Sequence, residues 1–236
     1  MEVIIGILIP FIGTIVGSLL VYFMKKELNR KIEFIIYGFA AGVMMAAAIW
    51  SLIMPSMEQG GGVVPCIIGL VLGVGIFYMI DVVMEKKATK KMNNLMVAVT
   101  LHNIPEGMAV GVAFASYLSG GLSLAACYAL AIGIAIQNFP EGSVISFPLL
   151  KKGYSKNKSF LYGFISAVFE LLGTLITLVF TNFVVAIMPY MLAIAAGAMI
   201  YVIVIELIPE SNSKSRLNVI GFLVGFIVMM VLDVML

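Results

Sequence analysis

Eight stretches of about twenty predominantly apolar residues constrain this chain more than any other feature of its sequence. A helix of about 20 residues is long enough to cross the hydrocarbon core of a bilayer, and it satisfies its own backbone hydrogen bonds there. The stretches cover residues 3–24, 34–55, 63–84, 94–117, 121–149, 159–181, 185–209 and 218–236. The sequence therefore predicts an all-α, polytopic membrane bundle of eight transmembrane helices. The connections are short, so residues 1–236 are expected to form a single transmembrane domain.

Charge supports this class and gives an orientation. Charged residues make up only 11% of the chain, against about 25% in soluble domains, and the mean hydropathy is +1.15. All fourteen Lys and Arg residues fall within or beside four alternate connections, at 25–31, 86–91, 151–158 and 214–216. The positive-inside rule places these connections in the cytoplasm and both termini outside. Because the basic residues are accounted for by topology, the net charge of +2 does not indicate a nucleic-acid partner.

Two segments resemble each other across the chain. Residues 40–55 read AAGVMMAAAIWSLIMP and residues 195–209 read AAGAMIYVIVIELIP, while GxxxG pairs occur at Gly69 and Gly73 and again at Gly221 and Gly225. The two copies run in opposite directions through the membrane, which predicts an inverted repeat of helices 1–3 and 6–8 around helices 4–5. The alternative is that small-residue motifs recur in any membrane bundle because they let helices approach closely.

Polar residues gather at one depth. His102, Gln137 and Glu170 lie about 8, 12 and 11 residues from the cytoplasmic edges of their segments, so at 1.5 Å per residue their depths agree within roughly 6 Å. Each ionised acid near the membrane centre costs about 2.5–3.5 kcal/mol on insertion scales. Glu106 and Glu141 occupy the same region. Some interaction must therefore offset the cost of placing these acids near the membrane centre.

The pattern HNIPEG at 102–107 returns as QNFPEG at 137–142. In each copy the first residue and the glutamate are four apart and share a helix face, with the asparagine at its border. Pro105 and Pro140 each leave a carbonyl oxygen without its helical donor. Nitrogen and oxygen ligands without thiolate suit Zn, Mn, Fe(II), Co or Ni, which predicts a metal site in a transport path. Taken singly, the histidine could be a helix-to-helix hydrogen bonder, the Pro-Gly pair a kink and the acid a protonated one, but the duplication argues against chance.

These paired motifs, within eight predicted spans, resemble the ZIP (Zrt/Irt-like) divalent metal transporters, in a form similar to the prokaryotic GufA-like branch. The resemblance covers essentially the whole chain and implies a binuclear centre. Its first metal would be bound by His102, Glu106, Gln137 and Glu141, with Met44 nearby. Its second metal would be bound by Asn103, Glu106, Asn138, Glu141 and Glu170, so that Glu106 and Glu141 bridge the two. Many members have histidine where Gln137 stands, which makes the first position less basic here.

Further polar residues are candidates for the path. Ser51 and Glu58 follow Met44 at steps of seven on one helix face, and Glu58 would attract cations at the outer mouth. Glu206, Asp81 and Glu85 lie towards cytoplasmic ends and would line an exit. For each of these residues, an ordinary polar position at a helix end is as good an interpretation as a place on the transport path.

The function predicted is transport of a divalent transition metal, zinc first, with Cd2+, Fe2+, Mn2+, Co2+ and Ni2+ as further substrates and no organic cofactor. The family implies import into the cytoplasm across the plasma or inner membrane by alternating access. The expected partners are metal ions and membrane lipid, and a homodimer is left open. A cation/proton antiporter is the alternative function. An intramembrane metalloprotease is a weaker one, because HExxH-type sites need two histidines and His102 is the only one in the chain, so no enzyme activity is expected.

Overall fold

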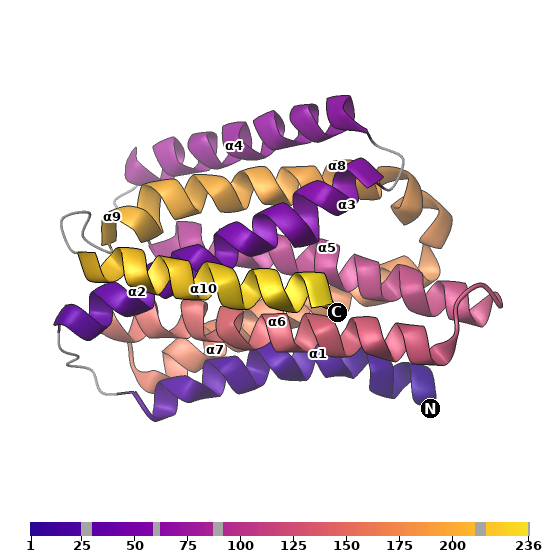
Figure 1. The fold of residues 1–236 in the computed structure, drawn as a ribbon, viewed down its shortest axis with the longest axis horizontal. Helices are drawn as coiled ribbons and strands as arrows, with labels where there is room; N and C mark the ends of the chain where they lie inside the picture. Colours follow the sequence, from indigo (N-terminus) through magenta and orange to yellow (C-terminus); the bar gives the residue numbers. More distant parts are fainter. Residues whose placement is uncertain (25–29, 59–61, 87–91, 211–215, 236) are drawn as a thin grey trace.

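The computed structural model describes residues 1–24, 30–58, 62–86, 92–210 and 216–235. Throughout this part of the chain the regular structure is helical, in eight long segments (Figure 1). Their bounds are α1 (Glu2–Leu19) with η1 (Leu20–Tyr22); α2 (Arg30–Ala47), η2 (Ala48–Ile53) and α3 (Met54–Ser56); α4 (Val63–Lys86); α5 (Met92–Leu118); α6 (Leu124–Lys151); α7 (Lys156–Val179); α8 (Thr181–Val202), η4 (Ile203–Leu207) and α9 (Ile208–Glu210); and α10 (Arg216–Met235). Each predicted stretch coincides with one segment, so the all-α class is confirmed.

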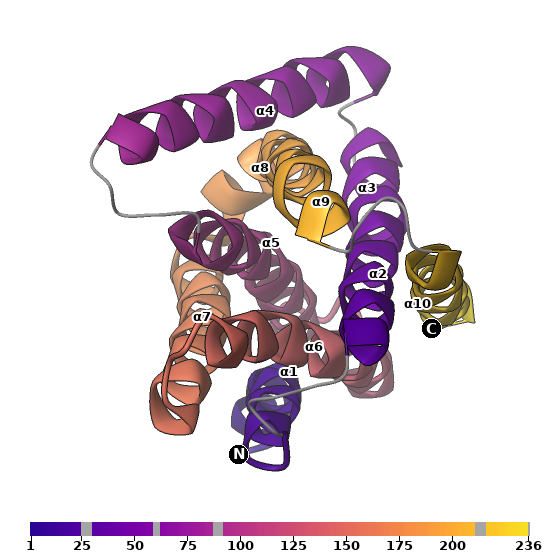
Figure 2. The same cartoon turned by 90° about the vertical axis from the view of Figure 1, so that its left-hand side faces the viewer.

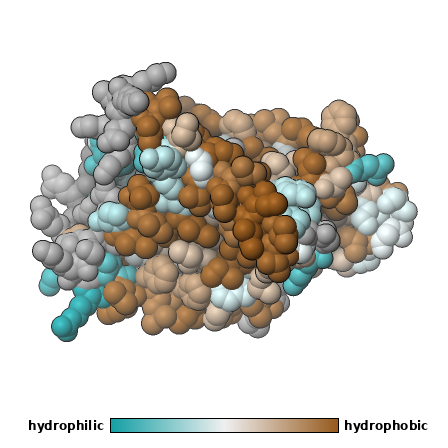
Figure 3. Space-filling model, turned by 90° about the horizontal axis from the view of Figure 1, so that it is seen from above, coloured by the Kyte–Doolittle hydropathy of each residue, from teal (hydrophilic) through white to brown (hydrophobic). Residues whose placement is uncertain are grey.

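Six of these segments are long and apolar enough to cross a membrane by length and composition. They are Glu2–Tyr22, Phe34–Ser56, Val63–Val83, Leu124–Lys151, Lys156–Val179 and Thr181–Ile205. Helix α5 is as long as the others but carries the polar HNIPEG motif, and the apolar part of α10, Arg216–Leu232, is shorter. Apolar side chains cover most of the middle of the molecular surface in Figure 3, as expected of a bundle surrounded by lipid.

The helices pack into two groups, which Figure 2 shows along the bundle. In one group α1 packs along α6 and α5 along α7; in the other α2 packs along α10 and α4 along α8. Helix α4 lies at the outer edge against α8 (Figure 2). The main core lies where α2 and α8 meet α5 and α6, and it contains Met44, Met108, Ile145, Met199 and Leu207. This core joins the two groups beside the duplicated motif.

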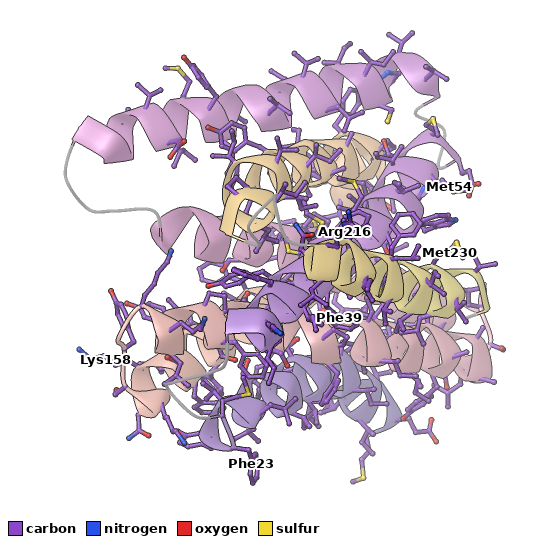
Figure 4. The ribbon with its side chains drawn as sticks, turned by 60° about the vertical axis from the view of Figure 1, so that its left-hand side comes forward. Phe23, Phe39, Met54, Lys158, Arg216 and Met230 are labelled. Carbon is purple, nitrogen blue, oxygen red and sulfur yellow. The ribbon has the colours of Figure 1, made fainter. Side chains whose placement is uncertain are left out.

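Glycines bring the helices of the second group into backbone contact. A Cβ atom on Gly42 of α2 would overlap the carbonyl oxygen of Phe222 on α10, and one on Gly197 of α8 would overlap that of Leu70 on α4. The GxxxG glycines of α4 and α10 face α8 and α2 in return: Gly73 meets the carbonyl of Ile194, and Gly225 that of Phe39. Figure 4 shows Phe39 where α2 and α10 cross. The two helix pairs therefore make the same contacts at matching positions of the two similar segments.

Both similar segments also change their helical winding at the same place. η2 and η4 are π-helical, and each is followed within two residues by a proline, Pro55 or Pro209, in a short α-helical turn. Since proline has no N–H to donate, the carbonyls before it need other partners, and a wider π turn is one local solution. π segments are frequent at functional sites. η2 contains Ser51, which the sequence placed on the transport path.

Candidate metal centre

The duplicated motif lies inside two continuous helices, with Pro105 in α5 and Pro140 in α6. Three acids that the sequence placed near the membrane centre are buried in the bundle. The exposed fraction is 5% for Glu106, 1% for Glu141 and 1% for Glu170, which comes from α7. Ionisable groups buried in this way are rarely retained unless a partner stabilises them.

Motif glycines hold the helices around these acids. A Cβ atom on Gly107 would overlap the carbonyl oxygen of Glu170, so α5 and α7 touch backbone to backbone at the level of that carboxylate. A Cβ atom on Gly142 would in the same way overlap the carbonyl oxygen of Thr14 and press α6 away from α1. These two contacts fix how closely α5 approaches α7, and α6 approaches α1, beside the acids.

The two motif asparagines are fully buried, and in both the amide nitrogen donates a hydrogen bond to another residue of the bundle. Asn103 Nδ2 donates to Ser166 Oγ at 3.2 Å. Asn138 Nδ2 donates to Glu170 Oε1 at 2.7 Å and to the Pro10 carbonyl oxygen at 3.5 Å. Because both partners of Asn138 are acceptors there, its nitrogen rather than its oxygen must face them.

The carbonyl oxygens of these amides have no donor among the residues that the structure describes. Asn103 Oδ1 and Asn138 Oδ1 accept no hydrogen bond from the described part of the chain, although both are buried. An unsatisfied buried acceptor costs about 1–3 kcal/mol, so two of them beside three carboxylates require an explanation. A divalent cation satisfies oxygens of both kinds at once, and the amide and carboxylate oxygens therefore fit a metal ion.

Gln137 connects the motif to the other helix group. Its Nε2 donates to Glu106 Oε1 at 3.0 Å and to Ser51 Oγ at 2.8 Å. The predicted path residue Ser51 is thus in direct contact with a predicted ligand. The bond joins α6 to the π-helical segment η2 across the boundary between the two groups.

The acids do not form a metal site by themselves. Among the described His, Cys, Asp and Glu side chains, no three come close enough together to hold one ion. A site here would therefore have to draw on the amides as well, as the predicted ligand set does. The side chain of His102 lies outside the described residues, so its predicted role stays a prediction.

The remaining predicted path residues differ in position. Met44 is fully buried in the main core with Met108 and Ile145 of the motif helices. Glu58 is exposed just beyond α3, and Asp81 Oδ2 accepts a hydrogen bond of 2.8 Å from Tyr201 on α8. Asp81 is therefore part of the α4–α8 contact. The side chains of Glu206 and Glu85 lie outside the described residues.

A cavity of about 560 Å³ reaches the centre from one end of the bundle. Glu106, Gln137 and Ser51 line its inner part, and Leu122, in the turn between α5 and α6, lines it at the end where the N-terminus also lies (Figure 1). The rest of its wall is mainly apolar, with Trp50, Val185 and Met188 among its members. Of the three buried carboxylates, Glu106 lines this cavity.

Three hydroxyl residues around the predicted ligands, Thr14, Thr100 and Ser166, were not predicted from the sequence. Thr14 Oγ1 donates to Glu170 Oε2 at 3.3 Å, and Ser166, which accepts from Asn103, also accepts from Thr100 Oγ1 at 3.3 Å. A signal for Thr14 was present: TIVGS at 14–18 matches ELLGT at 170–174 in the positions of its glycine and hydroxyl residue. The match is short and lies in apolar sequence, where such patterns are common.

Comparison with known proteins identifies the family of this chain. The profile of the family described as "ZIP Zinc transporter" matches residues 91–233, which is more than half of the chain and includes α5, α6 and α7. The chain belongs to the ZIP family. The family membership predicted from the paired motifs is thereby confirmed.

Relatives of this ZIP family member match it over nearly its full length. It is 33% identical to the zinc transporter GufA of Myxococcus xanthus over 95% of each chain. It is 30% identical to the zinc transporter ZIPB of Bordetella bronchiseptica over 94% of this chain and 77% of that protein, and 28% identical to human zinc transporter ZIP11 over 94% and 93%. All three are named as transporters, and the predicted likeness to the GufA branch is confirmed. The ZIP membership and the six apolar segments together establish a multi-pass membrane protein.

Proposed function

We propose that this protein transports divalent transition-metal ions, zinc first, across the plasma membrane into the cytoplasm. One observation carries the proposal: beside Glu106, Glu141 and Glu170, the buried oxygens Asn103 Oδ1 and Asn138 Oδ1 accept no hydrogen bond from any residue that the structure describes. A helix kink or a structural hydrogen-bond network gives no reason for two buried amide oxygens without donors. As ligands of an ion that the protein binds and releases, these oxygens would be satisfied whenever the ion is present.

The two ion positions inferred from the family fit the division of these groups. The first would use His102, Glu106, Gln137 and Glu141, on the side of the cavity that Gln137 and Glu106 line. The second would use Asn103, Asn138, Glu106, Glu141 and Glu170, on the side where the amides are fully buried. Its three carboxylates would have to come closer together than they are in this structure to hold one ion. When metal is bound, Gln137 would turn its Oε1 towards the ion, which gives up the present donation by Nε2 to Glu106.

Alternating access is the mechanism that we propose. Its inverted halves would be the first three spans (α1, α2 with α3, and α4) and the last three (α7, α8 with α9, and α10), around α5 and α6. The backbone contact made by Gly42 corresponds to the one made by Gly197, and the contact made by Gly73 corresponds to the one made by Gly225. This correspondence supports the repeat. With the predicted orientation, the end of the bundle at Leu122 faces the outside, and Glu106 and Gln137, which line the same cavity, would be reached from the external solution. The Ser51–Gln137 hydrogen bond crosses the boundary between the two groups, and it must break if they move past each other.

The function is tested by uptake into proteoliposomes. We expect zinc to enter vesicles that contain the purified protein and to be trapped there by an internal zinc dye. Cd2+, Mn2+, Fe2+, Co2+ and Ni2+ should compete with zinc to different extents, and Na+ should not drive flux. Sodium-driven proton movement without zinc flux would contradict the proposal and favour an antiporter.

The orientation gives a separate prediction. Ser119 after α5 and Ser155 before α7 are exposed, and the proposed eight-span topology places them on opposite sides of the membrane. Cysteines introduced there should be labelled by an impermeant maleimide from outside and from inside the cell respectively. The native Cys66 and Cys127 are buried and should contribute little background. Labelling of both positions from one side would contradict the topology.

A further inference from the structure

Thr14 lies in α1, outside the motif helices and outside the residues that the family profile matches. Its side chain is fully buried, and its Oγ1 donates to Glu170 Oε2 at 3.3 Å. Glu170 Oε1 accepts the 2.7 Å bond from Asn138. Both oxygens of this carboxylate are therefore held by neutral donors, which come from two different helices.

The position of Thr14 mirrors that of Glu170. Gly142 of α6 faces the backbone of Thr14 and Ser18 on α1, and Gly107 of α5 faces the backbone of Glu170 and Thr174 on α7. The hydroxyls one turn further along repeat the correspondence. Ser18 Oγ donates to the Gly142 carbonyl at 3.1 Å, and Thr174 Oγ1 donates to the Gly107 carbonyl at 2.9 Å.

The two crossings therefore differ in one chemically important place. Where the α5–α7 crossing has a carboxylate, the α1–α6 crossing has the hydroxyl of Thr14. A second carboxylate there would place two negative charges face to face at the membrane centre whenever no ion is bound. A hydroxyl adds no charge and supplies the donor that a carboxylate could not.

We propose that Thr14 is a positioning residue for the second metal position: its hydroxyl holds Glu170 Oε2, so that the carboxylate stays turned towards Asn138 and the ion. This inference rests on the proposed function, because it needs an ion beside Glu170. Hydrogen bonds of this kind orient metal ligands, and their loss typically costs about 10–100-fold in metal affinity. A single carboxylate at this crossing also keeps the second position weak enough to release its ion.

Zinc binding to the purified full-length protein tests the inference. We expect the wild-type protein to bind two zinc ions in equilibrium dialysis. Thr14→Val should weaken the second ion by about 10–100-fold and leave the first unchanged, while Thr14→Ser, which keeps the hydroxyl, should stay within about threefold of wild type. Thr177→Val is the matched control, because Thr177 is equally buried and its hydroxyl donates only to Gly173 of its own helix, at 2.8 Å.

A second arm asks whether Thr14 acts through Glu170. In a Glu170→Ala background, Thr14→Val should produce no further loss, since the bond that it removes is already absent. The inference is overturned if Thr14→Val binds the second zinc as the wild type does, if Thr14→Ser is damaged as much as Thr14→Val, or if the two substitutions are additive. A wild-type protein that binds only one zinc would overturn the second position and this inference together, whereas one that binds none would overturn the proposed function itself.

Discussion

Replacing Glu106 or Glu141 by alanine is expected to reduce zinc uptake into proteoliposomes to the level of protein-free vesicles. Both carboxylates belong to each of the proposed ion positions, so the loss of either removes negative charge from both. Glu106 is also an acceptor for Gln137, and its removal leaves that amide with Ser51 as its partner in the site. Glu170 belongs only to the second position. Glu170→Ala should therefore retain measurable uptake, with one zinc bound.

Controls separate charge from folding in this experiment. Glu106→Gln keeps the shape of the side chain and removes the charge, and it should be as inactive as the alanine variant if charge is what binds the ion. Glu2→Ala removes an exposed acid at the end of α1 and should transport as the wild type does. Anomalous scattering from zinc-soaked crystals counts the ions in each variant. Wild-type uptake by Glu106→Ala would mean that the repeated motif is a helix kink and not a transport site.

The helical architecture was predictable because a bilayer permits few alternatives. Each membrane helix must be long, apolar and internally hydrogen-bonded, and every predicted stretch coincides with a helical segment. The π-helical turns η2 and η4 were not predicted. They depend on how carbonyls before Pro55 and Pro209 find new partners, and hydropathy contains no information about that.

The candidate site was partly predictable for a similar reason. Carboxylates and amides inside apolar sequence are conspicuous, so Glu106, Gln137, Glu141, Glu170 and the asparagines could be selected from the sequence. Their bonding could not, because it depends on helices that are far apart in the chain. Asn138 meets Glu170 across thirty-two residues and Thr14 meets Glu170 across 156. Thr14 is a single hydroxyl in an apolar helix, and such residues are usually satisfied by their own backbone.

Gly107→Ala is expected to damage the fold and the site together. The added methyl would overlap the carbonyl oxygen of Glu170, which belongs to the backbone of α7 and cannot rotate away. The two helices must separate, which should lower the free energy of unfolding by about 1–3 kcal/mol or more. Because the same contact sets the position of Glu170, zinc uptake per folded molecule should also fall. Gly142→Ala should behave alike, since its methyl would overlap the carbonyl oxygen of Thr14 on α1.

Gly75→Ala is the matched control for both variants. Gly75 also lies within a membrane helix, α4, but a Cβ atom there would meet nothing within 4 Å. Alanine is about 1 kcal/mol more favourable than glycine inside a helix, so this variant should melt at the wild-type temperature or slightly above it. Thermal unfolding of the three purified variants, measured beside zinc uptake, separates close packing from helix propensity. If Gly107→Ala melted and transported like Gly75→Ala, the backbone contact between α5 and α7 would not be what positions Glu170.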